Sequence, residues 1–380
     1  MSLKLKIATA FSLGVFNLLR VFKYRIGVKT RLNPVQKLSA TMPSGNFFAD
    51  GQNNVESKPK IKHQTLTAFG YLNYQVKGTY PDWFYSPLTQ QSFANASKPW
   101  YQIPDFDANV GDIKGVWEAS RFDWVLEFAV QAKAEQNDVA LQCLDDWLNN
   151  WCQHNPAYMG PNWKCGQEAS IRVMHLVAAL IGLGQLDKTS ANVLLLIEVH
   201  LQRIAPTIDY AIAQDNNHGT SEAAALFIGG AVLDYIKENS KYKVWQTLGR
   251  KWLENRADQL IMQDGGFSQY SVNYHRVMLD SYYLAEIVRQ KLNLTTFSKD
   301  LYQQVAKATD WLYVLTQESG DVPNLGANDG ARLLPVSTTD YRDFRPTVQL
   351  GSTLFHQHSY YQDAGSYDQI LMFFVDLQNM

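Results

Sequence analysis

Four polar residues in a row, Asp215, Asn216, Asn217 and His218, come directly before a long run of small and apolar residues. An asparagine or histidine at the start of a helix can cap it, and Asn217 or His218 occupies the expected capping position. A cap explains only one polar residue of the four. A helix N-terminus carries partial positive charge and favours anions. Amide and imidazole donors at this point could therefore hold a carboxylate.

A second polar group lies at another expected helix start, in the segment "DGGFSQYSVNYHRVMLD" at 264–280. The residues of this segment that could take part in catalysis or binding are Gln269, Tyr274, His275 and Arg276. A tyrosine beside histidine and arginine could have a lowered pKa and carry protons. The simpler interpretation is a tyrosine packed at a helix start.

Further polar residues occur in a turn-rich loop at 320–335 and on two expected helices. In the loop, Asn324, Asn328, Asp329 and Arg332 could face a cleft or form a plain surface turn. The helix spacing puts Trp117, Glu118 and Arg121 on one face. Glu168 and Arg172 are four residues apart, which predicts either a helix salt bridge or a polar pair lining a ring of helices.

The elements that must position these residues are mainly helices. From residue 112 onward, apolar spacing predicts roughly eight consecutive helices separated by short breaks. Short loops favour antiparallel helix hairpins, and helices that are apolar all round, as at 223–232, must be buried. The sequence therefore predicts an all-α fold with an inner and an outer layer of helices. Residues 32–110 are rich in Pro, Gly, Asn and Ser and predict irregular chain with a few short strands. We expect an N-terminal segment, 1–110, packed on a helical domain, 111–380.

Composition excludes several classes of function. The 380 residues carry a net charge of −2 without a basic stripe, so nucleic acid is not an expected partner. Three cysteines without a CxxC motif predict neither a disulfide framework nor a zinc site. The pair of histidines at 356–358 is weak evidence for a metal. No nucleotide-binding glycine motif occurs.

The basic N-terminus contains an apolar stretch, Ile7–Leu19, that is too short to span a bilayer. It has no clear signal-peptide cleavage site. Its following residues are spaced as in an amphipathic helix. We expect this helix to pack on the fold, with a loose membrane-surface contact as the second interpretation.

Taken in order, several segments resemble the helical domain of the heparinase II/III-like polysaccharide lyases, including related alginate lyases. They are "LLRVFKYRIG", "WEASRFDWVLEFA", "GPNWKCGQEASIRVMHLVAAL", "NNHGTSEAAALFIGG", "DGGFSQYSVNYH" and "PNLGANDGARLLP". The resemblance covers nearly the whole chain, and its most specific parts are the NNHxxxE run and the segment around Tyr274.

The resemblance implies an incomplete (α/α) toroid and β-elimination at a uronic acid. It implies that Asn217, with His218 beside it, neutralises the substrate carboxylate and that Tyr274 is the catalytic acid or acid/base. Donors of this kind stabilise the enolate-like state that forms when C5 loses its proton. The expected partner is an acidic polysaccharide or oligosaccharide, and the expected location is periplasmic or extracellular. Weaker candidates for substrate contact are Trp117, Arg121, Trp163, Glu168, Arg172, Asn216, Gln269, His275 and Asn328.

Two departures from the family pattern bear on these expectations. Position 269 is glutamine, where an acidic residue is expected in many relatives. The resemblance also places "SYDQILMFFVDLQNM" at the last toroid helix, before a β-sheet domain that these residues do not include. Relatives draw a further histidine or tyrosine, and often a structural metal, from that domain. We therefore expect no cofactor in this chain, and a separate β domain or a second copy as a further partner.

Two other functions stay open on sequence grounds. The chain could be a glycan-binding toroid without catalysis. It could also be a glycoside hydrolase with a carboxylate pair such as Asp264 and Asp329, which would have to lie roughly 5–10 Å apart.

Overall fold

The computed structural model describes residues 14–48, 65–136 and 138–374. After an N-terminal helix, α2 (Val15–Lys29), short antiparallel strand pairs lead into a long series of helices. The strand pairs are β1 (Thr65–Ala68) with β2 (Leu72–Gln75), β3 (Tyr85–Ser86) with β4 (Gln91–Ser92), and β5 (Phe106–Asp107) with β6 (Gly111–Asp112). The helices that follow are α3 (Lys114–Trp117), α4 (Asp123–Glu135), α5 (Val139–His154), α6 (Gly166–Gly182), α7 (Ala191–Ile204), α8 (Ile208–Ile212), α9 (Asn217–Lys237), α10 (Lys243–Leu260), α11 (Val272–Lys291), α12 (Lys299–Leu315), α13 (Arg345–His356) and α14 (Gln369–Phe374).

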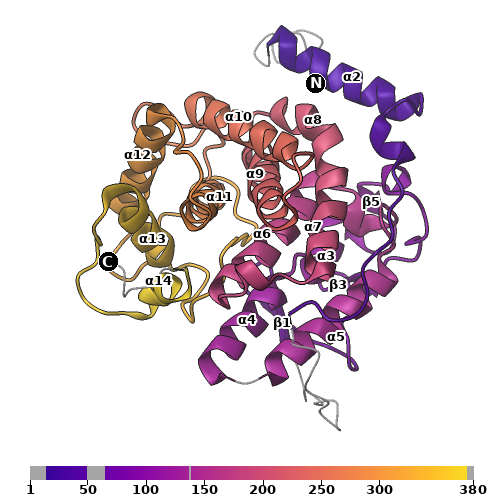
Figure 1. Ribbon diagram of the computed structural model, residues 1–380, viewed down its shortest axis with the longest axis horizontal. Helices are drawn as coiled ribbons and strands as arrows, with labels where there is room; N and C mark the ends of the chain where they lie inside the picture. The colour runs from indigo at the N-terminus through magenta and orange to yellow at the C-terminus, as the bar shows by residue number, and fades with distance from the viewer. Residues whose placement is uncertain (1–13, 49–64, 137, 375–380) are drawn as a thin grey trace.

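The long helices form two layers (Figure 1). An inner series runs α4, α6, α9, α11 and α13, in which each helix contacts the next. The outer helices pack on it: α5 on α4, α7 on α6 and α9, α10 on α9, and α12 on α11 and α13. This arrangement confirms the all-α fold with two helix layers that the sequence predicts and the toroid that the resemblance implies.

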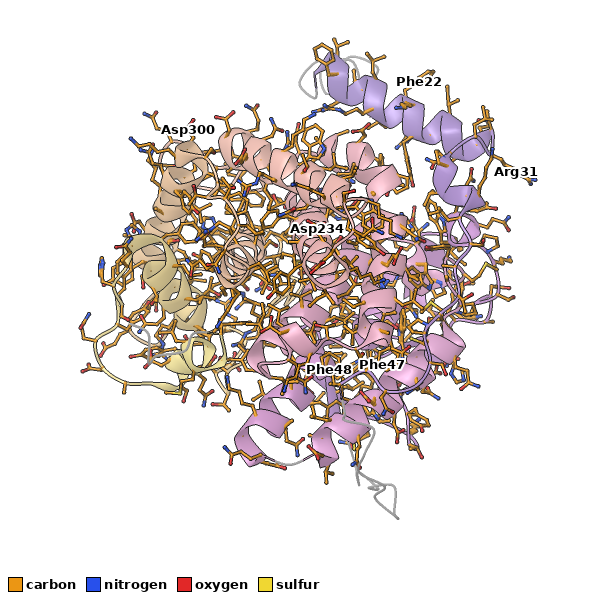
Figure 2. The ribbon with its side chains drawn as sticks, viewed as in Figure 1. Phe22, Arg31, Phe47, Phe48, Asp234 and Asp300 are labelled. Carbon is orange, nitrogen blue, oxygen red and sulfur yellow. The ribbon has the colours of Figure 1, made fainter. Side chains whose placement is uncertain are left out.

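Helix α2 lies at the edge of the molecule, and no residue of it is buried (Figures 1 and 2). One face packs on the toroid, as expected: Tyr24 stacks on Tyr210 of α8 with ring centroids 4.0 Å apart. Asn17 Nδ2 donates a hydrogen bond to Asp215 Oδ2 at 2.6 Å. The part of the apolar stretch before Gly14 lies outside the described residues. Within them, no helix has both the length and the hydropathy to cross a bilayer.

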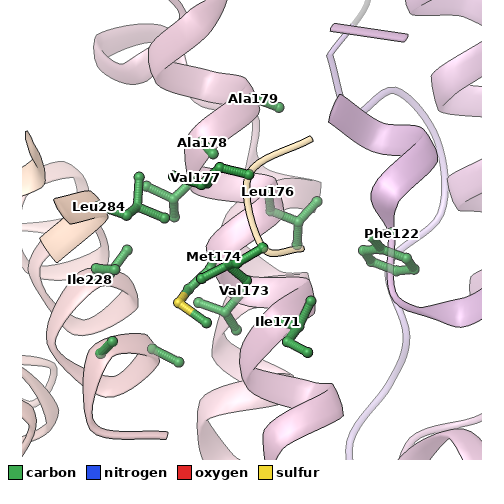
Figure 3. Close-up of a cluster of buried hydrophobic side chains, with 14 of the residues drawn as sticks. Phe122, Ile171, Val173, Met174, Leu176, Val177, Ala178, Ala179, Ile228 and Leu284 are labelled. Carbon is green, nitrogen blue, oxygen red and sulfur yellow. The ribbon is translucent and has the colours of Figure 1, made fainter. Parts of the chain in front are cut away.

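The inner helices are buried because their apolar residues cover all sides. In α9 every residue from Gly219 to Leu233 is buried, and α6 is buried from Gln167 to Gly182. Their side chains meet in the cluster of Figure 3, where Met174 and Val177 of α6 lie near Ile228 of α9 and Leu284 of α11. Glycines allow α9 and α10 to approach closely, since a Cβ on Gly249 would lie 2.2 Å from the backbone nitrogen of Phe227.

The expectation that Trp117, Glu118 and Arg121 share one face of a helix is wrong, although 115–135 has helical spacing. The chain instead forms α3, a 3₁₀ turn at Glu118–Ser120 and then α4. Phe122 separates them with a left-handed backbone (φ 72°) while its ring is fully buried against Trp124 and Trp151. Burial of the aromatic side chain outweighs the helical preference at this position. Trp117, Glu118 and Arg121 therefore lie before α4 rather than on it, and all three line the cavity described below.

Candidate active site

A cavity of about 710 Å³ opens where three inner helices begin. Residues from the first turns of α6, α9 and α11 line it, together with the α3 region and the loop at 329–341. The β1–β2 hairpin supplies a further part of the wall through Thr67, Gly70, Tyr71 and Asn73, and α4 contributes Asp123 and Glu127. The volume fits a ligand of several sugar rings.

The start of α9 presents an unpaired amide to this cavity. Asn216 is the N-cap, because its Oδ1 accepts the backbone N–H of His218 at 3.0 Å. This corrects the expectation that Asn217 or His218 caps the helix. Asn217 is the first helical residue, and its backbone N–H donates to Gln269 Oε1 at 3.2 Å. Its side-chain Nδ2 is buried and has no hydrogen-bond partner among the described residues. Such a donor is costly to leave unpaired, so it is a candidate contact for a ligand.

His218 also lines the cavity and is half-buried. Burial lowers the pKa of its imidazole, with a smaller opposing effect from Glu222 one turn further along α9. At neutral pH the ring is therefore uncharged and can donate one N–H and accept at the other nitrogen. Burial likewise raises the pKa of Glu222 to about 8, and the nearby His218 opposes this rise. One oxygen of the Glu222 carboxyl has no partner among the described residues.

Glu222 predicts a loss of stability at alkaline pH. Its folded-state pKa of about 8 is above the ordinary glutamate value of 4.5, so the folded protein binds this proton more tightly than the unfolded chain. This contribution is complete below about pH 4.5 and is lost as the pH rises through 8. The free energy of unfolding of Glu222→Gln, taken relative to that of the wild type, should therefore be higher at pH 9 than at pH 5 by roughly 3 kcal/mol. Urea unfolding at both pH values measures this.

The exposed Glu318 provides the control, because Glu318→Gln should leave the pH dependence of unfolding as in the wild type. Equal pH dependence in Glu222→Gln and wild type would contradict a protonated Glu222.

Tyr274 lies in the first turn of α11 and faces the same cavity. Its phenol donates a hydrogen bond to Asp329 Oδ2 at 2.7 Å, while Asn273 Nδ2 donates to Asp329 Oδ1 at 3.1 Å. Burial, followed by the charge of Asp329, raises the pKa of Tyr274. This corrects the expectation of a lowered pKa. The tyrosine is fully protonated at neutral pH, and its conjugate base is strong once formed.

His275 and Arg276 do not lower the pKa of Tyr274, because their side chains point to other parts of the structure. His275 is buried, stacks on Trp311 and contacts the carbonyl oxygen of Ala308 through Nε2 at 2.9 Å. Arg276 donates to the carbonyl oxygen of Ala331 and lies over the ring of Phe344. Neither lines the cavity.

An arginine between two carboxylates forms the next part of the wall. Arg121 Nε donates to Glu168 Oε2 at 2.9 Å, and its Nη1 donates to Glu118 Oε1 at 2.5 Å. Glu118 Oε2 also accepts the backbone N–H of Phe69 at 2.6 Å, which holds the β1–β2 hairpin against the cavity. Trp117 lines the cavity with its indole N–H bound to the carbonyl oxygen of Pro161.

Glu168 therefore does not form the predicted i,i+4 pair with Arg172. Arg172 is fully buried, donates to the carbonyl oxygen of Asn162 at 2.7 Å and to His200 Nε2 at 2.8 Å, and lies among aromatic rings. Trp163 belongs to the same core and is also fully buried. The proposed substrate contact is thus not supported for either residue.

Asn328 points away from the cavity as well: it is exposed and bonds Asn324 and the backbone of Gly330. Asp264 bonds the backbone of Gly266 outside the cavity, so it does not form a carboxylate pair there with Asp329. Eight of the twelve residues predicted from sequence do line the cavity: Trp117, Arg121, Glu168, Asn216, Asn217, His218, Gln269 and Tyr274.

No metal site accompanies this cavity in the part of the chain that the structure describes, where no group of three or more histidine, cysteine or acidic residues could hold an ion. His356 instead pairs with Asp310, with Nε2 and Oδ1 2.9 Å apart. Cys143, Cys152 and Cys165 are free thiols.

Comparison with known families agrees with this arrangement. A family model described as Heparinase II/III N-terminus matches residues 35–345. The chain belongs to the heparinase II/III family. All the cavity-lining residues lie within the segment that this heparinase II/III model matches.

A solved structure entitled "Crystal Structure of Heparinase III" is similar to this heparinase II/III family member, with a TM-score of 0.47 and 17% sequence identity. The match covers 90% of this chain and 51% of the other, so the chain spans about half the length of that protein. No curated protein sequence matches significantly.

Proposed function

We propose that this protein is a polysaccharide lyase that cleaves a uronic-acid-containing acidic polysaccharide by β-elimination. The observation that carries the proposal is the buried, unpaired Nδ2 of Asn217 in the same cavity as the protonated Tyr274. A carboxylate oxygen would satisfy the amide, and the hydrogen bond would strengthen as negative charge develops on that oxygen.

The surrounding helices favour an anion at this point. The N-termini of α6, α9 and α11 all lie at the cavity, and each carries partial positive charge from its unsatisfied N–H groups. The neutral imidazole of His218 can add a second N–H donor to the substrate carboxylate. Together these donors would make the proton on C5 more acidic without placing a full positive charge beside it.

Tyr274 would then act as the acid/base. Asp329 can accept the phenol proton along the hydrogen bond that already joins them. The phenolate takes the proton from C5, and the restored phenol passes it to the glycosidic oxygen leaving C4. A C4–C5 double bond forms in the product, and the proton held by Asp329 returns to Tyr274. Every proton and electron pair is thus accounted for without a cofactor.

The product tests the reaction class. Incubation with alginate, heparan sulfate or a bacterial uronate exopolysaccharide should produce the ultraviolet absorbance of the unsaturated uronate. A new reducing end without this absorbance would indicate hydrolysis instead. Binding without any cleavage would indicate a glycan-binding toroid.

The acidity of the cavity predicts how substrate affinity changes with pH. Burial raises the pKa of Glu118 to about 7, against the effect of Arg121, and raises that of Asp123 to about 6. Both carboxyls line the cavity and lose their negative charge as the pH falls. KM for a polyuronate should therefore fall roughly fivefold between about pH 8 and pH 5.5, since an anion is repelled less. Initial rates across this range measure the effect.

High salt provides the control for this electrostatic cause, because screening should flatten the pH dependence of KM. A KM that rises on acidification would contradict it.

A further inference from the structure

Helix α2 presents an apolar stripe to solvent. The exposed fractions of Val15, Phe16, Leu19 and Phe22 are 63%, 79%, 58% and 64%, and Ile26 is also exposed. Positions 15, 19, 22 and 26 follow the spacing of one helix face, and Phe16 lies beside it. Isolated exposed apolar residues are common, but a continuous stripe that includes two phenylalanines is not.

The stripe is held outward by contacts on the opposite face. Asn17 bonds Asp215, and Tyr24 stacks on Tyr210. The guanidinium of Arg20 lies 5.3 Å from the ring centroid of Trp252 in α10. On a helical wheel, residues 17 and 24 lie on the opposite side from 15, 19, 22 and 26. The helix therefore cannot bury its apolar stripe on the toroid without breaking these contacts.

Basic residues flank the stripe, and acidic residues are absent from the helix. Lys23 lies on one side of the stripe, and Arg25 and Lys29 lie on the other. All three are exposed. Long basic side chains can reach toward phosphate while their methylene groups and the neighbouring rings enter an apolar layer. Figure 2 shows Phe22 on the side of α2 turned away from the toroid.

We propose that α2 is an in-plane docking helix for the surface of an anionic lipid bilayer. The apolar stripe would enter the boundary between headgroups and acyl chains, and the flanking lysine and arginine residues would bind lipid phosphates. The charge complementarity selects a negatively charged surface over a neutral one. A helix of 15 residues is about 22 Å long and lies along the surface.

Vesicle sedimentation of the full chain tests this proposal. The protein should bind vesicles of equal parts phosphatidylcholine and phosphatidylglycerol, and bind pure phosphatidylcholine at least tenfold more weakly. The double variant Phe16→Ser/Phe22→Ser should lose at least tenfold in partitioning to the anionic vesicles, since burial of each ring contributes favourably. Added salt should weaken the binding of the wild type.

The matched control is Phe106→Ser/Val314→Ser, which removes two equally exposed apolar residues elsewhere, 72% and 80% exposed. It should bind as the wild type does. The thermal unfolding of both double variants should be unchanged, because the substituted side chains are exposed.

Three outcomes would overturn the proposal. The first is equal binding to neutral and anionic vesicles. The second is full vesicle binding by Phe16→Ser/Phe22→Ser. The third is a sedimentation-velocity dimer of the wild type that this variant abolishes, without vesicle binding by either protein, which would assign the stripe to a second copy of the chain.

Discussion

Replacing Asn217 with alanine is expected to lower kcat on a polyuronate by about 10²–10³-fold, the usual cost of removing one donor to a developing oxyanion. The side-chain Nδ2 has no partner among the described residues, so its removal breaks no described hydrogen bond. The cap of α9 is Asn216 and remains in place. Alanine is also well accommodated inside a helix. The variant should therefore fold normally and fail in the reaction.

Steady-state kinetics with thermal unfolding measure both halves of this prediction. Asn95→Ala is the matched control, because Asn95 is exposed and lies outside the cavity. It should keep wild-type kcat and KM. Asn217→Asp should be at least as impaired as the alanine variant, since a second carboxylate would repel that of the substrate. Full activity in Asn217→Ala would remove the neutralising role from this residue.

Tyr274→Phe is expected to reduce kcat by about 10²–10⁴-fold, because the variant cannot transfer a proton at the phenol oxygen. The ring and its packing remain, and only the hydrogen bond to Asp329 is lost. The unsaturated product is measured by its ultraviolet absorbance under single-turnover conditions, which separates the chemical step from product release.

Tyr270→Phe serves as the control, since Tyr270 is 74% exposed and does not line the cavity. It should turn over as the wild type does. If Tyr274→Phe and Asn217→Ala were both to retain activity, the proposed site would be wrong even if the protein proved to be a lyase.

The sequence was informative wherever the relevant physics is local. The helix start at Asn216–His218 and the one at Ser271–Tyr274 were both recognisable from capping residues followed by apolar runs. Local pattern did not fix the exact helix phase. The helix begins one residue away from the expected position, so that Asn216 is the cap. On α11, Tyr274 faces the cavity whereas the adjacent His275 is buried.

Contacts between distant segments could not be read from the sequence. The β1–β2 hairpin reaches the cavity through the bond from Phe69 to Glu118, 49 residues along the chain. Arg121 donates a hydrogen bond to Glu168, 47 residues away in the chain. Arg172 lies four residues after Glu168 in the same helix, but its side chain packs among aromatic rings instead. From the sequence, Asp329 is a polar loop residue and a candidate partner of Asp264 in a carboxylate pair, and its hydrogen bond with Tyr274 depends on the fold.

The alternating direction of the two helix layers determines over what distance the cavity attracts an anion. The outer helices α7 and α10 follow the inner helices α6 and α9 after short connections and pack on them, so each outer helix runs opposite to that inner neighbour. Antiparallel helix dipoles nearly cancel at a distance, and the protein as a whole has a net charge of only −2. The positive potential that the helix dipoles produce is thus confined to the first turn of each inner helix. An acidic polymer would accordingly be recognised by how long it stays once it touches the cavity, and hardly by how quickly it arrives.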